Sequence, residues 1–200
     1  MRSLILAAAC LIPLVGHTQE GLEDPTPDTP ITEDDAYEAV AWVEAEVNLW
    51  HEPGDPDGGE AGDWKLAIQG HRLWWISIYV ELSLWDEDVD GDGVIDIRHP
   101  NYEEIMWCLV FANDYLNFCD KWLWTLINSA EVRNEQARGY VDSAISCLAD
   151  DNWQGAYDYA EDAAEKLHLR SVQIGRAERD FDLATGWLQD AEDLLLFEDE

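Results

Sequence analysis

The chain has 200 residues, and 47% of them are hydrophobic, so it is long enough and apolar enough to fold around a core of its own. Its 44 acidic and 11 basic residues give a formal net charge of −33. This charge argues against nucleic acid and anionic membrane surfaces as partners, because both would be repelled, and it favours cations and basic proteins.

The first residues predict a secretory signal peptide. Arg2 supplies the positive start, and residues 3–16 form an apolar segment that is too short to span a membrane. We expect the signal peptide to cover residues 1–18 and the mature protein to be secreted, periplasmic or displayed at the cell surface. Residues 7–10 resemble a lipoprotein box that would attach lipid to Cys10, but Ala7 replaces the usual Leu, so we favour cleavage without lipidation.

An acidic, proline-rich linker is predicted over residues 19–35, because this segment cannot bury a core. The helical domain is expected over residues 36–200. Thr32 and Asp35 have the pattern of a helix start, and apolar residues then recur at helical spacing as far as Trp50. Residues 51–63 are rich in Gly, Pro and Asp and predict a loop.

Residues 64–85 fit two structures. Apolar and polar side chains alternate from Ile76 to Leu84, which is a strand pattern. The rest of the chain offers no second convincing strand, and a lone strand would leave its backbone groups unpaired. We therefore predict a mostly buried helix. His71, Arg72 and Glu81 argue against a membrane span there.

Residues 88–99, DVDGDGVIDIRH, carry the strongest chemical signal in the chain. The four aspartates Asp88, Asp90, Asp92 and Asp96 stand at positions 1, 3, 5 and 9 of a twelve-residue calcium loop, and Gly93 stands at position 6, where the chain must turn sharply. Composition alone would produce this pattern somewhere in the chain with a probability on the order of 10⁻³ to 10⁻². We therefore predict a calcium loop over residues 86–99.

The run DVDGDGVID resembles the loops of EF-hand and dockerin-type proteins, with Ile95 at the usual apolar position 8. The resemblance covers twelve residues. It implies that calcium is bound by the side chains of Asp88, Asp90 and Asp92, by the carbonyl of Val94, and by Asp96 directly or through water.

The chain departs from this pattern at position 12, where the bidentate acid of the family is replaced by His99. Neutral imidazole is a poor ligand for a hard cation that prefers oxygen. Asp86, Glu103 and Glu104 are further candidate ligands. Without the bidentate acid we expect a weak site, with a dissociation constant of roughly 10⁻⁴ to 10⁻³ M, which suits a structural ion in calcium-rich surroundings.

The second half of the chain has helical periodicity. Asn101 and Glu104 have capping-box spacing, and two lines of apolar residues follow at intervals of seven as far as Leu126. Residues 128–130 predict a break, and the next helix is expected to end near Leu148. From Trp153 onward, large apolar residues recur every seven positions, beside a seam of alanines that Arg170 interrupts.

These elements together predict an all-α fold, a bundle of about five helices with a long C-terminal heptad-patterned helix and one EF-hand-like loop. The turn and helix at residues 148–167 resemble part of a tetratricopeptide-type hairpin. Because no 34-residue repeat recurs, we interpret them as an ordinary antiparallel hairpin. The heptad seam fits either a coiled-coil dimer or an internal bundle helix.

Three cysteines remain after the predicted signal peptide. Cys108 and Cys119 are eleven residues apart on one helix, about 16 Å along its axis, so they cannot bond each other. Any disulfide must therefore use Cys147. A hairpin folded about residues 128–131 would place Cys147 nearer Cys119, and we predict a Cys119–Cys147 disulfide.

The function that the sequence favours is that of an exported, non-enzymatic binding or scaffold module that holds one structural calcium ion and engages a protein or another envelope component. An alternative is a module whose tryptophans, Trp74-Trp75 and Trp122 with Trp124, form a cleft for a sugar or peptide. A third is a metal-dependent enzyme that uses the acidic loop or the pair Glu165 and His168, although no second pair of that kind exists.

Overall fold

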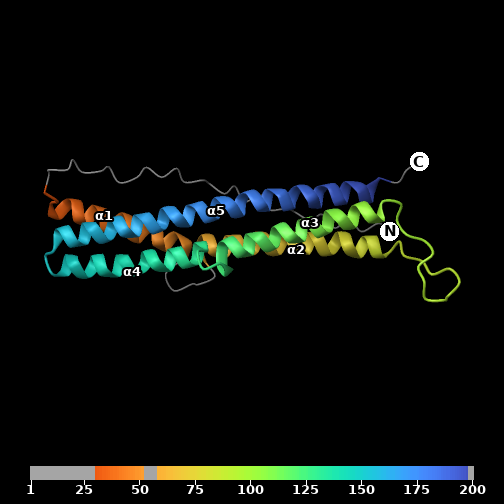
Figure 1. Ribbon diagram of the computed structural model, residues 1–200, viewed down its shortest axis with the longest axis horizontal. Coiled ribbons are helices and arrows are strands. Elements are labelled where there is room, and N and C mark those ends of the chain that lie inside the picture. The colour runs from red at the N-terminus through yellow and green to blue at the C-terminus, as the bar shows by residue number, and fades with distance from the viewer. Residues whose placement is uncertain (1–29, 52–57, 198–200) are drawn as a thin grey trace. The chain divides into compact units, whose positions relative to one another are not determined.

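The computed structural model describes residues 30–51 and 58–197. The predicted signal peptide, Cys10 and most of the predicted linker lie outside the described residues. Within these ranges every regular element is helical, and the predicted all-α class is confirmed (Figure 1). The elements are α1 (Glu33–Trp50), α2 (Gly59–Ser83), α3 (Tyr102–Asp120), the π-helical segment η1 (Lys121–Thr125), α4 (Ala130–Ala149) and α5 (Trp153–Leu196). Across the described ranges, none of these helices has the length and apolar character that a bilayer crossing requires.

Helix α1 begins where the sequence predicts. Thr32 is its N-cap: the Thr32 hydroxyl accepts a hydrogen bond from the Asp35 backbone N–H at 3.2 Å, and the Asp35 carboxylate accepts one from the Thr32 backbone N–H at 2.9 Å. This capping box satisfies two backbone donors that a helix start leaves without partners. Two hydrogen bonds from Thr32 lower the pKa of the Asp35 carboxyl. The bond from the Thr32 side chain has the larger effect, and the bond from its backbone N–H has the smaller one.

The chain forms two compact units. We call the first the loop unit: it contains residues 65–120 and 176–197, and so most of α2, the loop after it, α3 and the last part of α5. We call the second the α1 unit: its described residues are 30–51, 58–64 and 121–175, which include α1, η1, α4 and the first part of α5.

The α1 unit has a core of small side chains. Helices α1, α4 and α5 contribute mainly alanine and valine to it, and the small residues permit close approach of the helices. Helices α4 and α5 form the predicted antiparallel hairpin, whose turn contains Asp151 in a left-handed conformation with φ of 55°. The seam of alanines on α5 is buried, as its spacing indicates. The buried core residues with the smallest side chains are Ala36, Ala39, Ala137, Ala144, Ala156, Ala160 and Ala163.

Arg170, which interrupts that seam, is buried in the α1 unit with 5% of its surface exposed. Its guanidinium donates to the Glu46 backbone carbonyl at 2.9 Å and to Asn134 Oδ1 at 2.8 Å. Asn134 in turn donates to the Val47 carbonyl at 3.3 Å. Burial lowers the pKa of Arg170, and the nearby carboxylates of Glu60 and Glu46 oppose that shift. One arginine thus links α1, α4 and α5 through hydrogen bonds.

The loop unit has a core of larger side chains. Helices α2, α3 and α5 surround residues such as Ile105, Leu109 and Leu188, and several tryptophans pack against this core. Polar groups anchor the helices to one another: Trp75 Nε1 donates to the Leu109 carbonyl at 2.7 Å, and His71 Nε2 lies 2.9 Å from the Thr185 hydroxyl. Burial lowers the pKa of His71.

Helix α2 is only half buried, which corrects part of the prediction for residues 64–85. Residues 64–83 are helical, as predicted, and the buried face includes Trp64, Ile68, Ile78 and Leu82. The helix begins at Gly59, so the prediction of a loop over residues 51–63 was wrong for residues 59–63. Its opposite face, however, exposes large apolar side chains. The expectation of a mostly buried helix was wrong because apolar composition on both faces does not guarantee that both faces are covered within one chain.

The predicted Cys119–Cys147 disulfide is not formed, and the three cysteines of the described residues are free. The prediction assumed that α3 and α4 fold back on each other, whereas α4 packs against α1 and α5 in the α1 unit and α3 packs against α2 and α5 in the loop unit. The buried Cys119 thiol donates to the Ala177 carbonyl at 3.3 Å. Burial, with Asp180 and Asp120 nearby, raises the pKa of Cys119 to about 12, so this thiol is protonated and unreactive.

Candidate metal centre

The acidic loop connects α2 to α3 and is closed at its base by an antiparallel pair of residues. The Glu87 N–H donates to the Ile97 carbonyl and the Ile97 N–H donates to the Glu87 carbonyl, both at 3.1 Å. The Glu87 carbonyl also accepts from the Asp96 N–H at 2.8 Å. This pairing brings the two ends of the segment 88–96 together, so that residues eight positions apart in the chain become neighbours.

Two glycines and one aspartate shape the turn inside the loop. Gly91 has φ of 77° and Gly93 has φ of 88°, conformations that side chains with a Cβ rarely adopt. The Asp88 carboxylate accepts a hydrogen bond from the Gly91 N–H at 2.7 Å and another from the Gly93 N–H at 2.9 Å. Gly93 at position 6 therefore makes the sharp turn that the sequence pattern predicts.

Three of the predicted ligands converge. Asp88, Asp90 and Asp96 each place one carboxylate oxygen so that all three oxygens lie within 4.8 Å of one another. Asp96 is held by a hydrogen bond from the Val89 N–H at 2.9 Å. All three side chains are exposed, so water and ions reach them. Three negative charges at this separation repel one another, and a bound divalent cation would relieve that repulsion.

The other four predicted ligand side chains lie outside this cluster of three. Asp92 uses one carboxylate oxygen to accept a hydrogen bond from the Val94 N–H at 2.8 Å, which fixes the backbone at Val94. Asp86, before the loop, lies near Arg98, with 4.0 Å between the Arg98 Nε and the Asp86 Oδ1. Asp86 thus pairs with a basic residue across the base of the loop. Glu103 and Glu104 are exposed in the first turn of α3.

His99, at position 12, is turned into the protein. Only 2% of its surface is exposed, and its ring packs edge-on against Trp85 with 4.7 Å between the ring centroids. Its Nδ1 accepts a hydrogen bond from the Asn101 N–H at 3.1 Å, and its Nε2 is buried without a hydrogen-bond partner among the described residues. His99 therefore supports the junction between the loop and α3.

Sequence reasoning missed the residues that close and support the loop. Glu87 and Ile97 flank the aspartates symmetrically, and that symmetry is the signal that could have identified them. Trp85 could have been paired with His99 on the same ground. An open pocket of about 500 Å³ lies beside the loop and is lined by Glu81, Leu84, Trp85, Glu87 and Ile97.

The chemistry of the cluster suits a hard cation. Carboxylate oxygens are ligands that Ca²⁺, Mg²⁺ and Mn²⁺ prefer, whereas zinc and copper sites draw on imidazole and thiolate groups. Asp88, Asp90 and Asp96 are the group of three candidate ligand side chains that converges within the described ranges. Calcium accepts irregular sets of oxygen ligands, whereas magnesium demands near-ideal octahedral geometry, so calcium suits a carboxylate cluster of this kind better.

Trp74 and Trp75, two of the tryptophans of the alternative prediction, contact the core of their own unit. Trp75 donates to the Leu109 carbonyl and stacks on Tyr79 with 5.4 Å between centroids, and Trp74 packs against His71 and the core of the loop unit. Trp122 and Trp124 belong to η1, in the α1 unit. These contacts of Trp74 and Trp75 do not support a cleft for a sugar or peptide.

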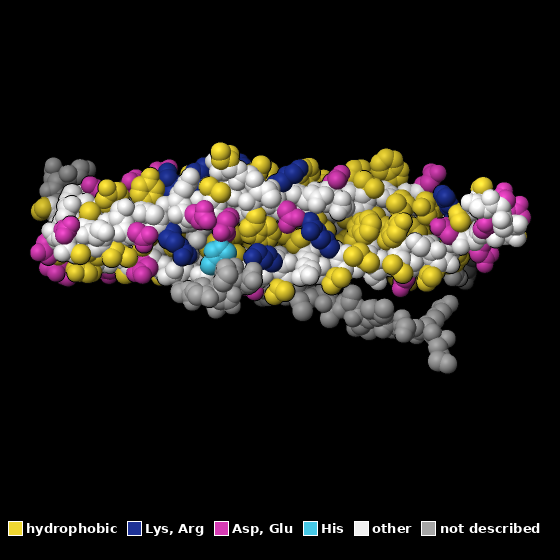
Figure 2. Space-filling view, turned by 90° about the horizontal axis from the view of Figure 1, so that it is seen from below, with side chains coloured by type: hydrophobic (Ala, Val, Ile, Leu, Met, Phe, Trp, Pro, Cys, Tyr) yellow, Lys and Arg dark blue, Asp and Glu magenta, His cyan; other side chains and the backbone are white. Residues whose placement is uncertain are grey.

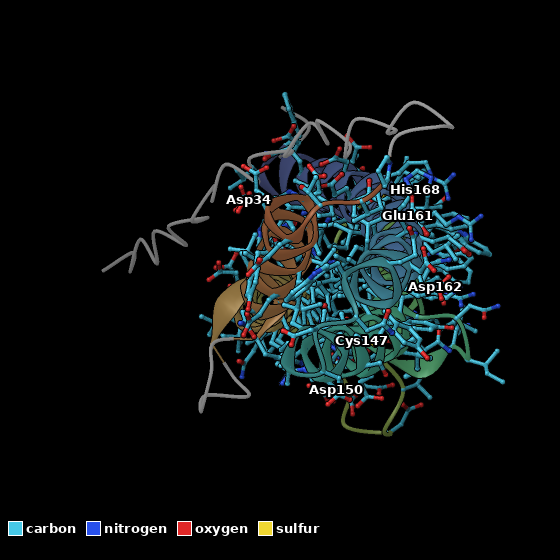
Figure 3. The ribbon with its side chains drawn as sticks, turned by 90° about the vertical axis from the view of Figure 1, so that its left-hand side faces the viewer. Asp34, Cys147, Asp150, Glu161, Asp162 and His168 are labelled. Carbon is cyan, nitrogen blue, oxygen red and sulfur yellow. The ribbon has the colours of Figure 1, made fainter. Side chains whose placement is uncertain are left out.

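Glu165 and His168, the pair behind the third prediction, are exposed on α5. Glu165 accepts a hydrogen bond from Lys166 at 2.9 Å. Figure 3 shows His168 projecting from the outer side of α5, together with Glu161 and Asp162. A di-iron bundle needs its glutamates and histidines inside the helices, so this arrangement does not support that chemistry.

Comparison with known proteins finds no match of three kinds: no protein family, no curated protein and no solved structure is significantly similar to this chain.

Proposed function

We propose that this chain is an exported, acidic helical protein that binds one calcium ion at the loop 86–99 and serves as a non-enzymatic binding or scaffold module. The observation that carries the proposal is the convergence of Asp88, Asp90 and Asp96 at a turn whose base is closed by Glu87 and Ile97. The Asp92 side chain and the Val94 carbonyl complete the ligand set that the sequence pattern implies.

The ion has a structural role in this proposal. Position 12 supplies no carboxylate because it is a histidine, and the ring of His99 is directed into the protein. A calcium loop without its bidentate ligand binds weakly. A site with a dissociation constant of roughly 10⁻⁴ to 10⁻³ M is filled where calcium is abundant, as it is outside cells. Filling it would neutralise part of the repulsion within the loop and fix the connection between α2 and α3.

Thermal unfolding with and without calcium tests the proposal. At 10 mM Ca²⁺ the expected affinity corresponds to a stabilisation of about 1.4–2.7 kcal/mol, or a rise in Tm of roughly 3–10 °C. The double variant Asp88→Asn/Asp90→Asn should lose this rise. The control Glu135→Gln/Asp142→Asn removes the same charge from exposed positions of α4 and should keep it.

A general effect of ions on an acidic protein is the competing explanation. If calcium raises the Tm of the loop variant as much as that of the parent chain, the ion acts by screening charge and the proposal is wrong. Hydrogen exchange gives a second readout. Calcium should slow exchange in residues 86–99 and leave α1 and α4 unchanged.

A further inference from the structure

Helix α2 is apolar on two opposite faces, but only one of them is covered. One face is buried and includes Ile68, Ile78 and Leu82. The other carries a row of large apolar side chains that are between 48% and 78% exposed, and we call it the outer α2 stripe: Leu66, Leu73, Ile76, Val80 and Leu84. A helix that is apolar all round is normally buried all round, so this stripe lacks a covering surface within the described residues.

Hydrophobic side chains also gather on the surface of the loop unit. Figure 2 shows a group of them on the face of this unit that it displays. Apolar residues scattered singly over a surface need no explanation, whereas a contiguous row marks an interaction site.

The outer α2 stripe has the spacing of a coiled-coil seam. Leu66, Leu73 and Val80 stand seven residues apart, and Ile76 follows Leu73 by three. Between them the surface is open at Gly70, where a Cβ would meet no described atom within 4 Å. A partner helix can pack against such a surface, because its side chains fit between the projecting ones and beside the small residue.

The charges near the stripe indicate which partner helix packs against it. Residues 64–80 contain no acidic residue, whereas about four would be expected in 17 positions at the average of this chain. Lys65 and Arg72 lie near the start of the stripe, and Glu81, Asp86 and Glu87 lie at or beyond its end. The Arg72 side chain, which pairs with Asp120, is still 45% exposed.

We infer that the outer α2 stripe is the interface for a second copy of this chain, with the two α2 helices antiparallel about a two-fold axis near residues 74 and 75. In this arrangement the basic start of each stripe faces the acidic end of the other, so the surface is complementary to itself. Leu73 of one copy then packs beside Ile76 of the other, and Leu66 lies beside Ser83.

Repulsion between the acidic loops selects the antiparallel direction. A parallel pair would place the two loops side by side. The antiparallel pair separates them by at least the length of the stripe, about 27 Å from Leu66 to Leu84, which exceeds the screening length of about 8 Å at physiological salt. The rest of the acidic surface can remain in solvent, and the acid-free segment lies in the contact.

Sedimentation equilibrium of the full chain tests the inference. The parent protein should form dimers at micromolar concentrations, and Leu73→Glu should raise the dissociation constant at least about 30-fold, since it buries a charge on each side of the interface. Ile145→Glu makes the same change at an exposed apolar position of α4, 42% exposed, and should leave the dissociation constant unchanged. Circular dichroism should show equal helix content in all three proteins.

Cysteine crosslinking tests the direction of the pair. In a Cys10→Ser/Cys147→Ser background, where the remaining Cys108 and Cys119 are buried, an equal mixture of Leu66→Cys and Ser83→Cys chains should form at least tenfold more disulfide-linked dimer than either variant alone. A parallel pair would link each variant to itself and would overturn the antiparallel assignment. A parent chain that remains monomeric at about 100 μM, or a Leu73→Glu dimer as tight as the parent, would overturn the interface itself. Neither measurement depends on calcium.

Discussion

The two units differ in their cores and in the apolar and acidic groups that they expose. In the α1 unit, small side chains fill the core, and Arg170 and Asn134 bind the backbone of α1. In the loop unit, the core is built from large aliphatic and aromatic residues, and the outer α2 stripe and the acidic loop are both exposed. The calcium site and the dimer interface that we propose therefore both lie in the loop unit.

The units also differ in how polar groups contribute to them. The α1 unit buries a charged guanidinium and satisfies it with carbonyl and amide oxygens. The loop unit buries the carboxylate of Asp180, which pairs with Arg179 at 3.0 Å, and neutral polar groups, as in the hydrogen bond between Trp75 and the Leu109 carbonyl. In the α1 unit the buried charge belongs to a hydrogen-bond network that joins three helices, and we expect this network to contribute to the stability of that unit.

Leu109→Ala should cause the largest loss of stability. Leu109 is fully buried in the core of the loop unit, and removing a buried leucine side chain costs about 3 kcal/mol, within a range of roughly 2–5 kcal/mol. Leu183→Ala, at a position of α5 that is 42% exposed in the same unit, should cost less than about 1 kcal/mol. Urea unfolding followed by circular dichroism gives both values. Equal losses would contradict the assignment of the core.

Arg170→Met should destabilise the α1 unit by about 2–3 kcal/mol. The substitution keeps much of the side-chain volume but removes the donors to the Glu46 carbonyl and Asn134, leaving buried acceptors without their partner. Arg138→Met removes the same charge from an exposed position of α4 and serves as the control in the same unfolding experiment. If the two variants lose equal stability, net charge rather than the network explains the effect.

His71 should give the smallest effect, a dependence of stability on pH. Burial lowers the pKa of His71, so the folded state favours the neutral imidazole. Its contribution is complete above the unfolded pKa of about 6.5 and is lost as the pH falls from there toward the lower folded value. Unfolding free energies of the parent and of His71→Gln, measured between pH 7.5 and 5, should therefore differ in slope, with the parent losing more. Identical slopes would contradict this role.

The sequence predicted local features well where one segment contains all the necessary groups. Thr32 and Asp35 form a capping box within four residues, and Asp88 and Gly93 make a turn within six. The heptad lines likewise predict burial: Leu109, Leu116 and Leu123 are fully buried. Each of these features depends on short-range geometry, which residue spacing encodes directly.

Features that depend on which helices become neighbours were not predictable in the same way. The disulfide prediction failed because α3 and α4 pack in different units, although they are close in sequence. The position of His99 was open for a related reason. Its spacing assigns it to the loop, but the ring of Trp85 offers it a buried contact on the other side.

The sequence by itself determined the helical class, the start of α1, the candidate calcium loop and the acid-free segment of α2, because periodicity, capping residues and charge are properties of local sequence. Only the tertiary structure decided that Asp88, Asp90 and Asp96 converge, that Arg170 is buried against α1, and that one apolar face of α2 is left exposed. These results depend on long-range packing, in which each apolar face competes for a limited number of partners within the chain.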